Sequence, residues 1–227
     1  ARTYILNKQD KENDKHKDAD VCTDPSHCKA YISEIQAEER WGEEWKISYM
    51  PKITEAVNET FGEIVTYNEE PIIAVFHSTS TGKTENSEDV WQSETPYLKS
   101  VDSPGEELSP RYKSQAEFSI NDFKNKITEL NNNAVFDNNM NLWVKNYEYT
   151  KGGSVKSVNI GGCTFSGTDI REKFSLRSAN FNISLSDKVV FYVTGNGHGV
   201  GMSQYGANYQ ASIGKNYKEI LMKYYQN

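Results

Sequence analysis

Apolar side chains recur at helical spacing in several segments of the chain. Residues 51–62 form one amphipathic face, with Pro51 suited to a first turn and Gly62 to a C-terminal stop. Residues 118–130 predict a helix that opens at Ser119 or Asn121. Further helices are predicted over 168–174 and over 216–225, where Asn216 and Glu219 have capping-box spacing.

Strand-like alternation fills much of the remaining chain. A hairpin is predicted from 63–67 and 72–78, and paired strands from 142–162 about Gly152 and Gly153. Residues 180–185 and 189–195 are also predicted strands. The pattern therefore predicts a single α+β domain over 1–227, with mostly antiparallel strands and several short helices.

The first thirty residues have a different character. Residues 1–8 have helical spacing but span only about two turns, too few to be stable alone, so we expect the chain to begin inside a helix. Residues 9–20 are almost wholly polar and indicate a solvated insertion, which we extend to residue 30.

Composition narrows the class of partner. The 227 residues carry a formal net charge of −7 without a cluster of Lys or Arg, so nucleic acid is excluded as an expected partner. No apolar run approaches the roughly 20 residues of a membrane span. No signal peptide is evident, so any membrane attachment is expected to come from a segment outside this chain.

One candidate segment for chemistry is HSTSTGKTENSEDVWQSETPYL, residues 77–98. His77 ends an apolar strand, and a hydroxyl-rich loop follows it. Its carboxylates could serve in acid–base chemistry, although acidic loop residues are usually only solvated; they are Glu85, Glu88, Asp89 and Glu94. A Ser78 nucleophile is disfavoured because the nucleophile-elbow pattern is absent.

A second segment is GNGHGVGMSQYGA, residues 195–207, with one histidine among five glycines. Such glycine density indicates unusual dihedral angles or close backbone approach. The alternative is an ordinary strand-to-helix loop in which His198 is a hydrogen-bonded packing residue.

The polar insertion contains a third candidate, a group of thiols and imidazoles. Two cysteines and two histidines match a closed tetrahedral zinc site in number and type; they are His16, Cys22, His27 and Cys28. Their spacing is not that of a zinc finger, so a Cys22–Cys28 disulfide or two free thiols remain alternatives. Zinc here is expected to be structural, because four protein ligands leave no open position.

Three blocks of the sequence resemble a known family. ARTY, AVFHSTSTGKTENSEDVW with PYLKSV, and GNGHGVGMSQYGA with the final EIL and YY resemble, in the same order, the stage II sporulation protein D family and its amidase-enhancer LytB relatives. VCTDPSHCKAY also resembles a Cys/His segment found in part of that family.

The resemblance implies a peptidoglycan lytic transglycosylase. Such an enzyme cleaves the MurNAc–GlcNAc bond of peptide-stripped glycan strands and leaves 1,6-anhydro-MurNAc ends. It implies work beside an amidase partner in forespore engulfment, on the extracytoplasmic face of the mother-cell membrane. The family's catalytic glutamate precedes the ARTY block, so it is expected upstream of Ala1.

The expected substrate contacts follow from the same resemblance. The two motifs should form opposite walls of a glycan-binding cleft, with the glycines allowing the backbone to approach a sugar ring. The predicted contacts are Arg2, His77, Ser78, Thr79, His198, Ser203, Gln204 and Tyr205.

One position of the loop after His77 departs from the family pattern. Thr81 stands where the family pattern has a glycine, so the loop is expected to run differently there.

A non-catalytic glycan-binding amidase enhancer is the main alternative function. A metal-dependent amidase is disfavoured because thiolates would fill the metal site.

Overall fold

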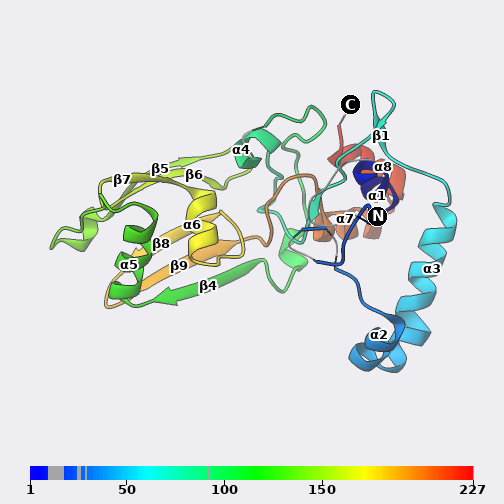
Figure 1. The fold of residues 1–227 in the computed structure, drawn as a ribbon, viewed down its shortest axis with the longest axis horizontal. Coiled ribbons are helices and arrows are strands. Elements are labelled where there is room, and N and C mark those ends of the chain that lie inside the picture. The colour runs from blue at the N-terminus through cyan, green and yellow to red at the C-terminus, as the bar shows by residue number, and fades with distance from the viewer. Residues whose placement is uncertain (10–17, 25–26, 29, 92, 227) are drawn as a thin grey trace. The chain divides into compact units, whose positions relative to one another are not determined.

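The computed structural model describes residues 1–9, 18–24, 27–28, 30–91 and 93–226. The chain forms two compact units, residues 1–74 and 75–227, which are treated separately below (Figure 1). Among the described residues, no helix is long and apolar enough to cross a membrane. The combination of helices with mainly antiparallel strands confirms the α+β class.

The first unit is mainly helical. A complete capping box between Ser33 and Gln36 starts its second helix, and Pro51 lies in the first turn of its longest one. Its elements are α1 (Arg2–Lys8), α2 (Glu34–Trp41), the π-helix η1 (Trp45–Tyr49), α3 (Met50–Glu59), β1 (Thr66–Tyr67) and β2 (Glu70–Pro71).

The hairpin predicted after α3 is only partly confirmed. Thr66 pairs with Pro71 and Tyr67 with Glu70, so each strand has two residues. Asn68 and Glu69 both have positive φ, +49° and +69°, the conformation of a tight primed turn. The amide of Ile72 also donates to the carbonyl oxygen of Val65, but Phe76 and His77 of the predicted second strand pair instead with Met202 and Ser203.

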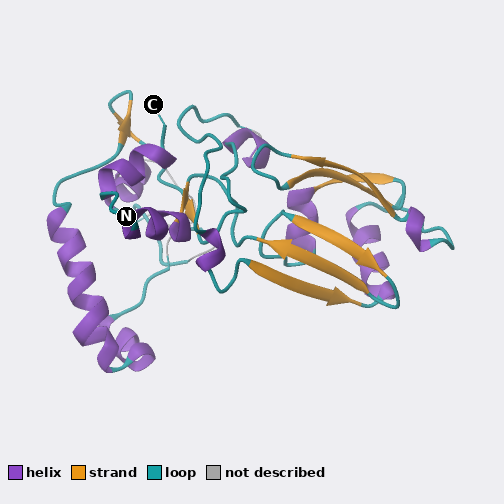
Figure 2. Ribbon diagram, turned by 180° about the vertical axis from the view of Figure 1, so that it is seen from behind, coloured by secondary structure: helices purple, strands orange, loops and turns teal. Residues whose placement is uncertain are grey.

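The second unit contains two three-stranded antiparallel sheets with two helices between them (Figure 2). We call residues 113–194, which hold both sheets, the sheet lobe. One sheet has the order β4–β9–β8, from β4 (Lys113–Phe118), β9 (Val189–Thr194) and β8 (Phe181–Leu185). The other is β5 (Val144–Tyr149), β6 (Val155–Ile160) and β7 (Cys163–Ser166), and the helices are α5 (Ile120–Leu130) and α6 (Gly167–Lys173).

The hydrophobic core of the sheet lobe is aromatic. Phe123 from α5 and Phe174 after α6 both contact Phe191 of β9, with ring centroids 6.2 and 4.8 Å apart. All three are buried, and every residue packed in this core lies between 116 and 193. The lobe therefore has a core of its own.

The rest of the second unit surrounds a short parallel pair. β3 (Phe76–His77) and β10 (Met202–Ser203) pair in parallel, although more than a hundred residues separate them in the chain. Around them lie α4 (Ser87–Trp91), the 3₁₀ helix η2 (Glu106–Leu108) and the final helices α7 (Gln204–Ser212) and α8 (Tyr217–Tyr224), whereas the 3₁₀ helix η3 (Met140–Leu142) belongs to the sheet lobe. The predicted capping box of α8 is confirmed.

Candidate functional site

The parallel pair joins the two motifs singled out in the sequence. His77 lies in register with Ser203, and isolated bridges join Thr79 to Asn196 and Glu85 to Val200. Backbone hydrogen bonds reinforce the contact, since Thr79 and Asn196 exchange both bonds, at 3.0 and 2.8 Å. Segments 77–85 and 195–203 therefore form one continuous structure within the second unit.

Other parts of the protein fill the space that a side chain on the glycines of this loop would need. A Cβ on Gly197 would lie 2.7 Å from the Cβ of His77, and one on Gly199 would lie 2.8 Å from the Cγ of Glu85. A Cβ on Gly201, where φ is +73°, would lie 2.3 Å from the carbonyl oxygen of Val75. The glycines thus allow the loop to pack tightly against segment 75–85, a function that needs no ligand.

His198 is fixed by two backbone contacts. The N–H of Val200 donates to its Nδ1 at 3.1 Å, which places the proton on Nε2, and Nε2 donates to the carbonyl oxygen of Phe76 at 3.0 Å. Both ring nitrogens are thereby engaged, which supports the packing interpretation. The ring also lies against Trp91, with centroids 5.1 Å apart.

His77 lies beneath this surface. Its Nδ1 donates to the carbonyl oxygen of Val200 at 3.2 Å, and its Nε2 has no hydrogen-bond partner among the described residues. Burial, with a smaller contribution from His198, lowers the pKa of His77 to about 3, so it is neutral at physiological pH. No hydrogen bond joins it to Ser78 in the described structure, so a serine–histidine pair is not formed.

A buried carboxylate organises the base of the site. Glu106, 1% exposed, accepts hydrogen bonds from the Ser80 amide and hydroxyl, both at 2.9 Å, and from the hydroxyls of Ser103 at 2.6 Å and Ser203 at 2.8 Å. Because Ser103 donates to Glu106, the Tyr224 hydroxyl, 2.6 Å away, donates to Ser103. These contacts tie segment 80, η2, β10 and α8 together.

Gly206 of α7 is required by this network. A Cβ there would lie 2.1 Å from the Ser103 hydroxyl and 2.3 Å from that of Tyr224. A helix normally disfavours glycine, by about 1 kcal/mol relative to alanine. The SQYGA segment thus contains a glycine because the hydroxyl chain runs through the space of its missing side chain.

The residues predicted to contact the substrate fall into a buried group and a more exposed group. His77, Thr79 and Ser203 are at most 4% exposed, so they support the loop from beneath and do not face a ligand. Thr79 donates to the hydroxyl of Ser109, and Ser203 caps α7. The others in this unit lie nearer the surface; they are Ser78, His198, Gln204 and Tyr205.

The loop carboxylates are already engaged. Glu88 and Glu94 both pair with Lys99, at 3.0 and 2.5 Å, and a backbone hydrogen bond together with Lys99 lowers the pKa of Glu88. A general acid needs a raised pKa, so the environment of Glu88 is unsuited to that role. Asp89 accepts a hydrogen bond from Asn86.

Glu85 is inaccessible to a substrate. It is 2% exposed, and its Oε1 accepts from the amide of Ser154 at 3.1 Å. The sequence showed it as one acidic residue among several in a polar loop, and only the fold shows its burial. Thr81 keeps negative φ, and Gly82 takes the left-handed value of +107°.

Two residues of the site had no clear sequence signal. Glu106 lies in a Ser- and Glu-rich stretch typical of solvated loops, and its burial depends on hydroxyls from distant segments. Trp91 ends the short helix α4; the residue is 42% exposed, and its ring lies beside His198. The only hint in the sequence is a single tryptophan within an otherwise polar loop.

The first unit holds the remaining predicted residues. Arg2 donates from one nitrogen to the carbonyl oxygens of Thr60 and Glu63, at 2.5 and 2.9 Å, and so links α1 to the turn after α3. Its predicted contact with the substrate stays a prediction.

A possible metal centre lies in the same unit. The sulfur atoms of Cys22 and Cys28 lie 3.4 and 3.5 Å from Nδ1 of His27, and all three donor atoms fall within 4.8 Å of one another. No disulfide joins the two cysteines in the described chain. His16 lies outside the described residues, so its part in the site stays a prediction.

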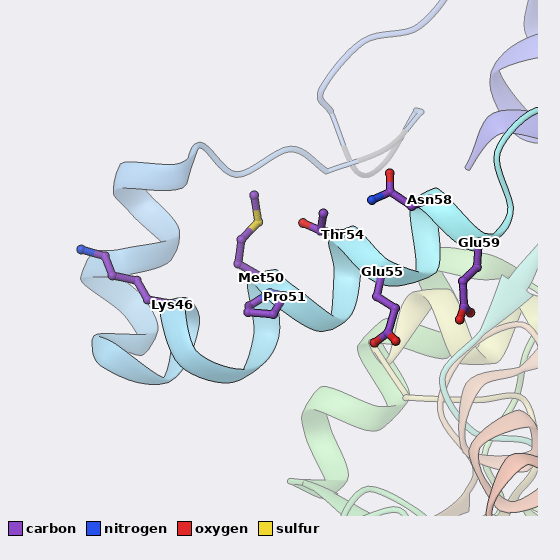
Figure 3. A pocket seen from close by; sticks show the side chains of 7 residues that line it. All are labelled: Lys46, Met50, Pro51, Thr54, Glu55, Asn58 and Glu59. Atoms are coloured by element: carbon purple, nitrogen blue, oxygen red, sulfur yellow. The ribbon is translucent and has the colours of Figure 1, made fainter.

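A pocket of about 670 Å³ lies along η1 and α3 (Figure 3). Met50, Thr54 and Asn58 line one side of α3, and Glu55 and Glu59 line the other. None of the residues predicted for the site lines it, and we assign it no function.

Comparison with known proteins places the chain in a family. Residues 1–67 match the family described as "Stage II sporulation protein". Stage II sporulation protein D of Bacillus subtilis (strain 168) is 42% identical over 198 residues, covering 86% of this chain and 55% of that protein. Its counterpart in Bacillus amyloliquefaciens is 39% identical over 229 residues, covering 100% of this chain and 64% of that protein.

A more distant relative carries a different name. The amidase enhancer of Bacillus subtilis (strain 168) is 28% identical over 228 residues, covering 78% of this chain and 32% of that protein. The chain belongs to the stage II sporulation protein D family. It spans somewhat more than half the length of the two sporulation proteins that it matches.

The Glu106 network leads to a prediction about stability. Glu106→Ala removes the acceptor of four buried hydrogen bonds, so we expect the free energy of unfolding to fall by about 3 kcal/mol or more in urea titrations. Glu106→Gln should cost less, because the hydroxyls of Ser80 and Ser103 can rotate to accept from the new amide. Glu117→Ala, at an exposed ion pair with Lys188, is the matched control and should change stability far less, because exposed ion pairs contribute little. Equal, small effects of Glu106→Ala and Glu117→Ala would contradict a structural role.

The buried His77 leads to a prediction about pH. Between pH 6.5 and about 3 the unfolded chain binds a proton at this residue and the folded chain does not. Stability is therefore lost as pH falls through this window, by up to about 1.4 kcal/mol per pH unit from this residue. His77→Asn keeps a donor for Val200 but does not titrate, so the stability difference between the two proteins should shrink or reverse with acidification. Parallel pH profiles of unfolding would show that His77 is not buried and neutral.

Proposed function

We propose that this chain is the greater part of a peptidoglycan lytic transglycosylase acting on peptide-stripped glycan strands during forespore engulfment. The observation that carries the proposal is the exposed Trp91 side chain against His198, on a loop bonded to the segment of Ser78, whose carbonyl oxygen accepts from the amide of Tyr205. An exposed aromatic face with neighbouring hydroxyl and amide groups has the chemistry of a sugar subsite. Membership of the sporulation family is consistent with it.

The catalytic acid is proposed to be a glutamate N-terminal to Ala1 in the natural protein. The loop carboxylates of this chain support that assignment, since Glu85 is covered and Glu88 and Glu94 are paired with Lys99. The residues of the second unit would then bind and orient the glycan. The same proposal places the protein on the extracytoplasmic face of the mother-cell membrane, beside an amidase that supplies stripped strands.

Cleavage by the natural-length protein tests this proposal. Mass spectrometry of peptide-free strands should reveal 1,6-anhydro-MurNAc ends, and Trp91→Ala should lower their formation about tenfold, equivalent to about 1.4 kcal/mol, without changing Tm. Trp143→Ala is no control because that ring is buried, whereas Tyr149→Ala removes an aromatic side chain that is 53% exposed and should leave cleavage unchanged. His198→Ala should both impair cleavage and cost about 2 kcal/mol, because two hydrogen bonds are lost.

The main alternative is a glycan-binding amidase enhancer, favoured by the name of the relative from Bacillus subtilis. It predicts strand binding and faster amidase turnover, with no anhydro ends from the natural-length protein. If residues 1–227 alone form anhydro ends, the catalytic acid lies within this chain and the assignment upstream is wrong.

We also propose that Cys22, His27 and Cys28 hold a structural zinc ion. Two thiols and an imidazole within 4.8 Å are the soft donor set that zinc prefers, and His16 is the predicted fourth ligand. When bound, zinc would stabilise the fold of the polar insertion and supply no chemistry. The Tyr4 side chain of the ARTY block hydrogen-bonds Cys28, so such a centre would also anchor α1.

Metal analysis tests the zinc proposal. About one zinc per chain is expected in the purified protein, lost in Cys22→Ser and retained in Cys163→Ser, whose cysteine lies on β7 in the other unit. Chelation should lower the Tm of the wild type and leave that of Cys22→Ser unchanged. A protein without metal, in which Cys22 and Cys28 are oxidised to a disulfide, would refute the proposal.

A further inference from the structure

The outer face of the β4–β9–β8 sheet bears an aligned row of side chains. Tyr192, in the central strand, lies in register with Gln115 on one side and Asn182 on the other. Tyr192 is 47% exposed, while the side chains that alternate with it, such as Phe191, enter the core. The row is thus an aromatic ring flanked by two amides on the solvent side of a sheet.

The row lines a depression in the surface. Gln115, Tyr192 and Asn182 surround a space of about 600 Å³ together with Lys113 and Thr194, which pair in the next row. That volume is in the range of small-molecule sites. None of the described residues hydrogen-bonds the side-chain amides of Gln115 or Asn182, or forms an ion pair with Lys113.

We propose that this row is a second glycan subsite, which binds hexosamine residues of the same strand that occupies the loop site. The inference rests on the proposed function, because it takes the substrate to be a long glycan. Tyr192 would stack on a sugar ring, and Gln115 and Asn182 would hydrogen-bond hydroxyl or acetamido groups. Lys113 would pair with the lactyl carboxylate of a MurNAc residue from which the stem peptide has been removed.

A short stretch of chain joins the strand that carries Tyr192 to the loop that carries His198. β9 ends at Thr194, and the next residue begins the glycine loop that carries His198. Tyr192 lies about 10 Å from Gly195 along the extended strand, since each residue advances about 3.3 Å. Gly195 donates to the carbonyl oxygen of Tyr112, which fixes this junction. Only a glycan long enough to reach from the loop site to the outer face of this sheet would contact both subsites.

The charged side chains around the row distinguish it from an ordinary solvated sheet face. Glu117, the next outward residue of β4, is paired with Lys188, so the neighbouring acid is neutralised. Lys113 thus remains as a cation beside uncharged donors and acceptors. That combination favours a mostly neutral polymer with occasional carboxylates, which is the composition of a stripped strand.

Kinetics on substrates of two lengths test the inference. With the natural-length protein and long stripped strands, Tyr192→Ala should raise KM about tenfold with kcat unchanged. Oligosaccharides too short to span both subsites should be cleaved at the wild-type rate. Tyr149→Ala, an exposed tyrosine on the other sheet, is the matched control and should match the wild type on both substrates.

A variant that removes the charge of Lys113 tests the role of this residue separately from that of Tyr192. Lys113→Gln should weaken sedimentation with long stripped strands several-fold but not with chitin oligomers, which lack the lactyl carboxylate. If Tyr192→Ala binds and cleaves long strands like the wild type, or loses activity equally on long and short ones, the second subsite is refuted while the proposed function stands. If the wild-type protein neither sediments with strands nor cleaves them, both proposals fail.

Discussion

The part of the molecule that carries the candidate site depends on the buried carboxylate of Glu106. This region contributes nothing to the aromatic core, which is confined to residues 116–193. Its segments come from three distant stretches of chain, and they meet at one anion that accepts four hydrogen bonds. A buried anion without such donors would be strongly unfavourable, so these segments must be in place together.

This arrangement explains several otherwise unrelated sequence features. Ser80, Ser103 and Ser203 are hydroxyl donors because the anion needs them, and Gly206 is a glycine because no side chain fits beside them. The glycine loop packs on the same base through His77 and Glu85. The surface beside Trp91 and His198 thus rests on a polar support in which most hydrogen-bonding groups are satisfied, which restricts its motion.

Much of the fold could be predicted from local signals in the sequence, whereas the pairing of strands far apart in the sequence could not. Asn216 with Glu219 and Ser119 mark helix starts by their own hydrogen bonds, and the turn at Gly152 and Gly153 marks a hairpin. The strand at 113–118 was missed because Ser114 and Ala116 give it only weak apolar alternation. The parallel pairing of Phe76 with Met202 could not be read from the sequence, since nothing local encodes a partner so far along the chain. The burial of His77, Glu85 and Glu106 could not be predicted for the same reason, because it depends on segments that are distant in the sequence.

The boundaries of the sheet lobe have a consequence for how such a protein can vary. The chain enters the lobe at Lys113 and leaves it at Thr194, and these two residues are paired neighbours in adjacent strands. The lobe is therefore an inserted module with adjoining ends and an apolar interior of its own. Insertions into the lobe away from Ser154, whose amide binds Glu85, would leave the path of the surrounding chain unchanged, so evolution can remodel much of the lobe while the carboxylate-centred half retains its geometry.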